Sequence, residues 1–143
     1  MNDNKIKLFL VDDDMLFLKS LEIDFLDRAD FIIETYATGE LCILNLSNNP
    51  DVIILDYYLD GIDPSAMNGI QTLDLIREIN PDIPVVILSS QDSIEVAVDC
   101  MHHKAYDYVV KSETAFIRLQ KIISSIFQFK KMEKTLSWYM ERM

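Results

Sequence analysis

The stretch that decides the fold is LFLVDDDMLF, residues 8–17, in which four apolar residues lead directly into three consecutive aspartates. An apolar run of this length that ends at polar residues is typical of a strand buried on both faces of a sheet. The three carboxylates would raise one another's pKa values and destabilise the fold unless a cation lay among them. The stretch therefore predicts a buried strand with a polar site at its carboxyl end.

The rest of the chain repeats this alternation of short apolar runs and segments with helical periodicity. Strands are predicted at 6–11, 31–36, 52–55, 85–89 and 106–110, and helices at 15–29, 39–46, 69–79, 93–103 and 113–142. A strand followed by a helix, five times over, predicts an α/β fold with a doubly wound five-stranded parallel sheet and helices on both faces.

The composition argues against several classes of protein. The 143 residues include 24 acidic and 13 basic side chains, a formal net charge of −11, which disfavours binding to nucleic acid or to anionic membrane surfaces. No apolar run is long enough to span a bilayer and no signal peptide is apparent, so we expect no membrane insertion and a cytoplasmic location. Cys42 and Cys100 stand alone, and we expect both to be small buried residues on helices.

Polar residues follow four of the five predicted strands, at the point where each strand ends. They are Asp12, Asp13 and Asp14 after the first strand, Asp56 after the third, Ser89 and Ser90 after the fourth, and Lys111 after the fifth. Ligands of open parallel sheets bind beyond the carboxyl ends of the strands. We therefore expect these side chains to form one site, with Asp14 serving as the N-cap of the first helix.

With these motifs the chain resembles the receiver domain of bacterial two-component response regulators, over about residues 5–128. The matching motifs are VDDD (11–14), LD (55–56), LSS (88–90) and YVVK (108–111). Four motifs in this order, each after the appropriate strand, make the resemblance specific. It implies a flavodoxin-like receiver fold.

The resemblance also implies a role for each matched residue in phosphoryl transfer. Asp56 would be the phosphoacceptor, a carboxylate nucleophile that forms an aspartyl phosphate. Ser89 would donate a hydrogen bond to a phosphoryl oxygen, and Lys111 would pair with the phosphoryl charge. Tyr108 would be the aromatic switch residue whose burial follows the movement of Ser89, although a half-buried strand tyrosine is the simpler alternative.

The same resemblance implies a Mg²⁺ site, and the ion would be the cation that the crowded aspartates need. Asp13 would bind the ion directly and Asp12 partly through water, with Asp56 and the carbonyl of Tyr58 as further ligands. Mg²⁺ prefers oxygen ligands and keeps some of its waters, which leaves positions for phosphoryl oxygens.

The predicted function is that of a phosphoacceptor in two-component signalling rather than an enzyme with a separate substrate. A histidine kinase or phosphotransfer protein would supply the phosphoryl group, and a downstream protein would respond by contact. One alternative is a receiver-like scaffold that is not phosphorylated. Another is an aspartyl-phosphate hydrolase, but that chemistry needs an acid where Tyr58 stands. A flavodoxin-like cofactor carrier is disfavoured because Asp12 and its neighbours would repel a phosphate.

The chain departs from the family pattern in the 57–68 loop and at Lys104, and it carries Asp60 and Ser112 where the family often has prolines. Asp56 and Gly69 are 13 positions apart, where the family has about eight, so the 57–68 loop is longer by roughly five residues. Lys104 stands where a helix-ending glycine is frequent, and a positive φ there would cost about 1 kcal/mol.

The last predicted helix extends past the end of the expected domain. We expect a receiver domain at 1–128 and a helical extension at 129–143, with no output domain in the 32 residues after Lys111. Apolar residues recur along the extension at Phe129, Met132, Leu136, Met140 and Met143. An exposed stripe of this kind predicts a homodimer or a docking arm for another protein, and a frayed linker is the alternative.

Overall fold

The computed structural model describes residues 5–28 and 30–143 and contains one parallel five-stranded sheet. The strands are β1 (Ile6–Val11), β2 (Phe31–Tyr36), β3 (Val52–Asp56), β4 (Val85–Ser89) and β5 (Asp107–Val110). Their order across the sheet is β2-β1-β3-β4-β5, and every neighbouring pair is parallel. All five carboxyl ends therefore lie at one edge, as predicted, and the strand limits differ from the predicted ones by at most one residue.

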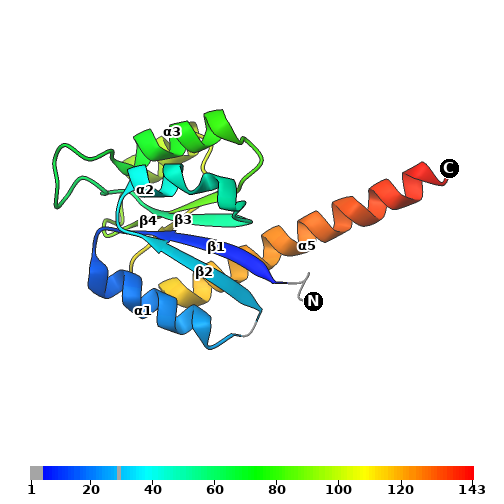
Figure 1. Ribbon diagram of the computed structural model, residues 1–143, viewed down its shortest axis with the longest axis horizontal. Coiled ribbons are helices and arrows are strands. Elements are labelled where there is room, and N and C mark those ends of the chain that lie inside the picture. The colour runs from blue at the N-terminus through cyan, green and yellow to red at the C-terminus, as the bar shows by residue number, and fades with distance from the viewer. Residues whose placement is uncertain (1–4, 29) are drawn as a thin grey trace.

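Helices cover both faces of this sheet (Figure 1). The helices α1 (Met15–Leu26) and α5 (Ala115–Glu141) pack on one face, and α2 (Gly39–Leu44), α3 (Gly69–Ile79) and α4 (Ile94–His102) pack on the other. The predicted α/β doubly wound fold is confirmed. None of the described helices is both long enough and apolar enough to cross a membrane.

Each face of the sheet contributes its own hydrophobic core. On one side Phe25 and Leu119 pack against Leu8 and Leu10, and on the other Leu73 packs with its neighbours against the opposite face. All residues of β3 and β4 are buried, which explains why these strands read as continuous apolar runs. Cys42 and Cys100 are both buried free thiols on helices, as expected.

Two predicted helices end two or three residues earlier than the periodicity suggested, and two others one residue earlier. The helix predicted at 39–46 stops at Leu44 because the side-chain amide of Asn45 donates to the carbonyl of Leu41 at 2.8 Å. A short 3₁₀ turn, η1 (Leu46–Asn48), follows, and Asn49 takes a positive φ of 58°. The helix predicted at 15–29 ends at Leu26, and its predicted last residue, Ala29, lies outside the described residues.

Two further expectations concern the ends of α4 and α5. Lys104 takes a positive φ of 67° directly after α4, in the place where a glycine is frequent. Helix α5 begins at Ala115 rather than 113, and its C-terminal half extends away from the body of the molecule (Figure 1). Its residues from Lys131 onward are all exposed.

Candidate functional site

The turn after β1 separates the three aspartates into different environments. Asp12 is buried, and its Oδ1 accepts a hydrogen bond from the backbone N–H of Asp14 at 2.9 Å. The Asp14 side chain turns outward and accepts from the N–H groups of Leu16 and Phe17, both at 3.2 Å. Asp14 is therefore the N-cap of α1, as predicted, and not part of the central cluster.

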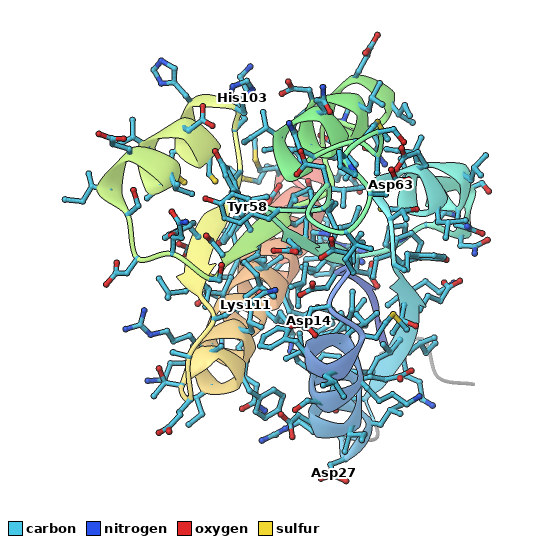
Figure 2. The ribbon with its side chains drawn as sticks, turned by 90° about the vertical axis from the view of Figure 1, so that its left-hand side faces the viewer. Asp14, Asp27, Tyr58, Asp63, His103 and Lys111 are labelled. Atoms are coloured by element: carbon cyan, nitrogen blue, oxygen red, sulfur yellow. The ribbon has the colours of Figure 1, made fainter. Side chains whose placement is uncertain are left out.

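Three carboxylates meet at the carboxyl edge of the sheet. Asp12, Asp13 and Asp56 each place one oxygen within 4.8 Å of the others. Asp12 and Asp13 follow β1 and Asp56 ends β3, so the cluster joins two neighbouring strands. Figure 2 looks onto this edge, with Asp14, Tyr58 and Lys111 around its centre.

Lys111 brings a positive charge to these carboxylates from the end of β5. Its Nζ lies 2.7 Å from Asp12 Oδ2 and 3.5 Å from Asp56 Oδ1. The Lys111 side chain is 14% exposed, and its ammonium lies 4.7 Å from the centre of the Phe17 ring. The lysine side chain is thus largely buried between two carboxylates and an aromatic ring.

The protonation of Asp56 reflects this crowding. Burial, and then the charge of neighbouring Asp12, raises the pKa of Asp56 from its ordinary 3.8 to about 7, against the opposing effect of Lys111. Burial alone would lower the pKa of Lys111, but its contacts with Asp12 and Asp56 outweigh burial and raise it. One lysine therefore does not neutralise the cluster, because two buried carboxylates share it.

The donor set fits a small divalent cation. Asp12 Oδ2 is fully buried, and its close contact is the Lys111 ammonium at 2.7 Å. The same ammonium also faces Asp56, so one positive charge serves two buried carboxylates. Three carboxylates at this spacing supply the hard oxygen ligands that Mg²⁺ prefers, and a bound cation would balance the remaining negative charge.

The ends of β4 and β5 carry the remaining predicted residues. Ser89 is fully buried, and its Oγ accepts a hydrogen bond from the N–H of Gln91 at 3.1 Å. Tyr108 is half-buried, and its hydroxyl donates to the carbonyl of Gln91. Both side chains are thus tied to the same residue of the β4–α4 loop, whereas Ser90 is exposed.

The long 57–68 loop lies against the carboxylate cluster, a contact that the sequence did not indicate. The N–H of Ile62 donates to Asp13 Oδ2 at 3.3 Å, and the N–H of Met67 donates to Glu40 Oε2 at 2.9 Å. A Cβ atom at Gly61 would lie 3.6 Å from both Asp13 Oδ2 and the carbonyl oxygen of Tyr58. Two of the predicted ion ligands therefore face the space beside Gly61.

A second contact network, also missed in the sequence, begins at the residue after Asp56. The hydroxyl of Tyr57 donates to Asp99 at 3.1 Å, and His103 lies 3.6 Å from Asp99 and 2.8 Å from Asp74. This network links the loop after β3 to α3 and α4. Its members are far apart in the chain, and no spacing rule would have paired them.

Comparison with known proteins agrees with this geometry. The family model of the response regulator receiver domain matches residues 8–124. A protein-glutamate methylesterase/protein-glutamine glutaminase from Clostridium acetobutylicum is 35% identical over 117 residues, covering 78% of this chain and 32% of that protein. The regulatory protein LuxO of Vibrio cholerae is 31% identical over 69% of this chain and 21% of its own length. The chain spans about a third or less of these relatives.

Solved structures share the fold over nearly the whole chain. The signal receiver domain of a putative LuxO repressor from Vibrio parahaemolyticus superposes with a TM-score of 0.78 at 23% identity, covering 92% of this chain and 97% of that one. A chain of the CheX–CheY–BeF3–Mg²⁺ complex from Borrelia burgdorferi gives a TM-score of 0.74 at 25% identity, over 85% of this chain and 89% of the other. The matched family, fold and acidic cluster lead to one conclusion: this chain belongs to the receiver domains of two-component response regulators.

Proposed function

We propose that this receiver domain accepts a phosphoryl group on Asp56, with Mg²⁺ bound at Asp12, Asp13, Asp56 and the carbonyl of Tyr58. The observation that carries the proposal is the cluster of three carboxylates within 4.8 Å of one another, two of them buried, against which the structure sets a single lysine. Mg²⁺ in the CheY complex from Borrelia burgdorferi supports the choice of ion. The ion would neutralise charge on the phosphoryl oxygens and favour the ionised form of Asp56.

The reaction is a transfer of the phosphoryl group between two nucleophiles. An ionised Asp56 oxygen attacks phosphorus, the bond from phosphorus to the donor's histidine nitrogen breaks, and that nitrogen keeps the bonding electrons. The product is an acyl phosphate on Asp56. The donor is a phosphorylated histidine kinase or phosphotransfer protein, and the responding partner is a downstream protein.

Lys111 and Ser89 supply the groups that stabilise the transferred phosphoryl group. Lys111 already lies 3.5 Å from Asp56, so its ammonium reaches an oxygen of a phosphoryl group on that residue. Ser89 uses a lone pair to accept from Gln91, which leaves its hydroxyl proton free to donate to the phosphoryl group. Catalysis of phosphoryl transfer depends mainly on such positioning and electrostatics.

The proposed response to phosphorylation involves the two residues tied to Gln91. When Ser89 turns towards the phosphoryl group, its bond from the Gln91 N–H is lost and the β4–α4 loop is free to shift. Tyr108 is bonded to the carbonyl of the same Gln91, so the shift also changes the position of the tyrosine ring. Tyr108 is in this way the proposed reporter of the phosphorylated state.

The test is phosphorylation by a small donor. The wild-type chain, incubated with acetyl phosphate and Mg²⁺, should gain one phosphoryl group by intact-protein mass spectrometry, and Asp56→Asn should gain none. Asp63→Asn is the matched control, because Asp63 is an exposed carboxylate in the neighbouring loop, and it should react like the wild type. Uptake by Asp56→Asn at the wild-type rate would refute the proposed acceptor. No uptake by the wild type would favour the unphosphorylated scaffold.

A further inference from the structure

Helix α5 carries two apolar stripes that do not run into each other. The first stripe, Ala115, Leu119, Ile123 and Ile126, is buried against the sheet. Continued at the same spacing it reaches Lys130 and Glu133, which are charged. The burial of α5 ends at this point, which supports our placing the receiver domain at 1–128 and an extension, here called the arm, at 129–143.

A second stripe begins at Phe129 and lies on a different side of the helix. It consists of Phe129, Met132, Leu136 and Met140, together with Met143 just after the end of α5, and is called the arm stripe. Each of these side chains is between 61% and 102% exposed. At about 100° per residue, two successive steps of three lead from Ile126 to Met132, which lies about a third of a turn away from Ile126 around the helix. The arm stripe is therefore a separate contact surface and not a frayed continuation of the core.

The separations between successive residues of the arm stripe are the same whether they are counted from its first residue or from its last. Its members are separated by three, four, four and three residues, so the stripe is symmetric about Leu136. In an antiparallel pair of arms related by a two-fold axis, Phe129 faces Met143 of the second copy, Met132 faces Met140, and Leu136 faces Leu136. Such self-complementarity is what an isologous dimer interface requires.

The charge distribution favours the antiparallel arrangement over the parallel one. Residues 1–128 include 22 acidic and 9 basic side chains, a net charge of −13, whereas residues 129–143 include 2 acidic and 4 basic ones, a net charge of +2. Parallel arms would place two strongly acidic bodies side by side. Antiparallel arms separate them by about 20 Å of helix, more than twice the screening length of about 8 Å at physiological salt.

A hollow at the base of the arm adds a contact for Met143 of the second copy. It has a volume of about 470 Å³, and its apolar wall includes Pro81, Pro84 and Tyr106 of the body together with Phe129 of the arm. Charged side chains line the rest of it: Arg77, Asp82, Lys104, Lys130 and Glu133. In the antiparallel pair, Met143 of the second copy reaches Phe129 and so comes to this hollow. Parallel arms would leave it unfilled.

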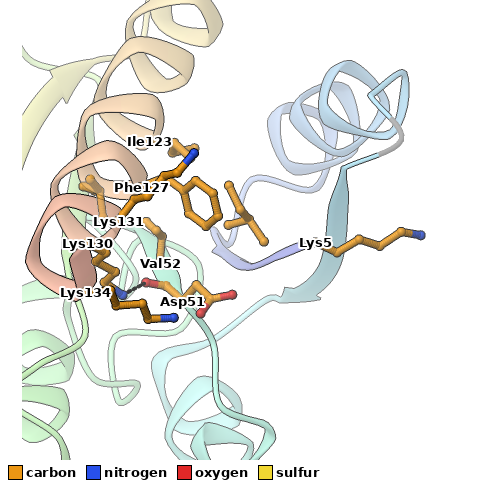
Figure 3. Close-up of a pocket in the computed structure, with 10 residues that line it drawn as sticks. Lys5, Asp51, Val52, Ile123, Phe127, Lys130, Lys131 and Lys134 are labelled. Carbon is orange, nitrogen blue, oxygen red and sulfur yellow. Dashed lines mark hydrogen bonds between the residues drawn. The ribbon is translucent and has the colours of Figure 1, made fainter. Parts of the chain in front are cut away.

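The opposite side of the arm is cationic rather than apolar. There a hollow of about 540 Å³ is lined by Lys5, Lys130, Lys131 and Lys134 beside Phe127 (Figure 3). Lys131 and Lys134 lie roughly opposite the arm stripe at 100° per residue. This cationic side therefore does not compete with the arm stripe as the contact surface.

We propose that the arm stripe pairs with the arm stripe of a second copy of this chain, antiparallel and centred on Leu136. The interface extends over about two heptads of helix, which is short for a coiled coil. Formation of the dimer is therefore concentration-dependent. It does not depend on phosphorylation of Asp56.

Sedimentation velocity over a range of micromolar concentrations tests the pairing. The wild type should pass from monomer to dimer, and Leu136→Asp should remain a monomer. Trp138→Asp is the matched control, because it makes the same kind of change on the far side of the arm, and it should still dimerise. A monomeric wild type throughout the range, or a dimer in Leu136→Asp, would overturn the proposal.

Cysteine cross-linking tests the direction of the pair. Phe129→Cys and Met143→Cys chains, mixed and mildly oxidised, should form a disulfide between the two different variants, because these positions face each other only in antiparallel arms. Each variant alone should stay uncross-linked, and the wild type is the blank because Cys42 and Cys100 are buried. Cross-linking of each variant with itself, and not with the other, would show a parallel pair and contradict the proposed arrangement.

Discussion

At the carboxyl edge of the sheet, two carboxylates and most of a lysine are buried, whereas beyond the amino edge the arm exposes the apolar side chains of the arm stripe to water. The first arrangement costs free energy because charges are removed from water. The second costs free energy because apolar surface stays in water. Folding alone explains neither.

The two regions differ in the binding partner that would offset this unfavourable free energy. The carboxylates of Asp12, Asp13 and Asp56 need a cation, which is small and diffuses in from solution. The arm stripe needs a second protein surface of matching spacing. The two regions therefore respond to different variables, the first to Mg²⁺ and pH and the second to protein concentration. Three predictions use this separation. Each concerns a substitution in the carboxylate cluster or its loop, and none of these substitutions should alter self-association.

The largest expected effect is a pH-dependent gain in stability when Asp56 is replaced by Asn. The pKa of Asp56 is about 7 in the folded chain and has its ordinary value of 3.8 in the unfolded chain. Between these two pH values Asp56 is protonated in the folded state and ionised in the unfolded state. Stability therefore falls as pH rises from about 4 to about 7, and the loss is complete above 7. Asp56→Asn lacks this titration and should be more stable by a few kcal/mol at pH 8, and little changed near pH 4.

Urea unfolding with a chelator present, at pH 5 and at pH 8, measures this difference. Added Mg²⁺ should stabilise the wild type at pH 8 much more than Asp56→Asn. Asp63→Asn serves as the control, since Asp63 is exposed and its hydrogen bonds with Ser65 lower its pKa. Equal stability of the wild type and Asp56→Asn at both pH values would show that folding does not raise the pKa of Asp56.

The second prediction compares two neighbouring aspartates with the same change of charge. Asp13→Asn removes a carboxylate that we propose to bind Mg²⁺ directly, and Mg²⁺ affinity should fall by about tenfold or more, at least about 1.4 kcal/mol. Asp14→Asn should leave the affinity within about twofold, because Asn is an equally good N-cap and Asp14 faces away from the cluster. Isothermal calorimetry with Mg²⁺ measures both. Equal losses in the two variants would mean that net charge, and not ligation, governs binding.

The carboxyl edge could be predicted from the sequence because a parallel sheet leaves no freedom in where its strand ends meet. Asp56 and Lys111 are 55 positions apart, yet both must come to the same edge once β3 and β5 belong to one parallel sheet. Asp14 was equally predictable, since a helix N-cap is a local feature of a few residues. The placement of these residues needed no knowledge of tertiary contacts.

The contacts of the 57–68 loop could not be predicted for the opposite reason. Asp13 is bonded to the backbone N–H of Ile62, and any residue except proline carries that donor. Which N–H reaches Asp13 depends on the path of the loop, which includes a turn at Asp63 and Ser65 and the tie from Met67 to Glu40. The side chains of Asp74, His103 and Asp99 meet for a similar reason, because the packing of α3 against α4 decides the contact.

The smallest predicted effect is the one that depends most on this loop. Gly61 has no unusual backbone requirement, since none of the glycines described has a positive φ, so a side chain there acts through the space it fills. Its Cβ would stand 3.6 Å from Asp13 Oδ2 and from the carbonyl of Tyr58, in ordinary van der Waals contact. The two γ-carbons of a valine extend further, into the space that the ion and its waters would occupy. We therefore expect Gly61→Val to weaken Mg²⁺ binding by about three- to tenfold, on the order of 1 kcal/mol.

Calorimetry at several pH values separates this steric effect from a change in the charge of the cluster. A blocked space should weaken binding by the same factor at pH 7 and at pH 9, because all three carboxylates of the cluster remain. Ala66→Val, which adds the same bulk elsewhere in the loop, should leave the affinity unchanged. If Gly61→Val bound Mg²⁺ as tightly as the wild type, the loop would have to move away from Asp13 when the ion binds. The hydrogen bond from Ile62 to Asp13 would then be a feature of the metal-free chain only, and protection of the Ile62 amide from hydrogen exchange should fall when Mg²⁺ is added.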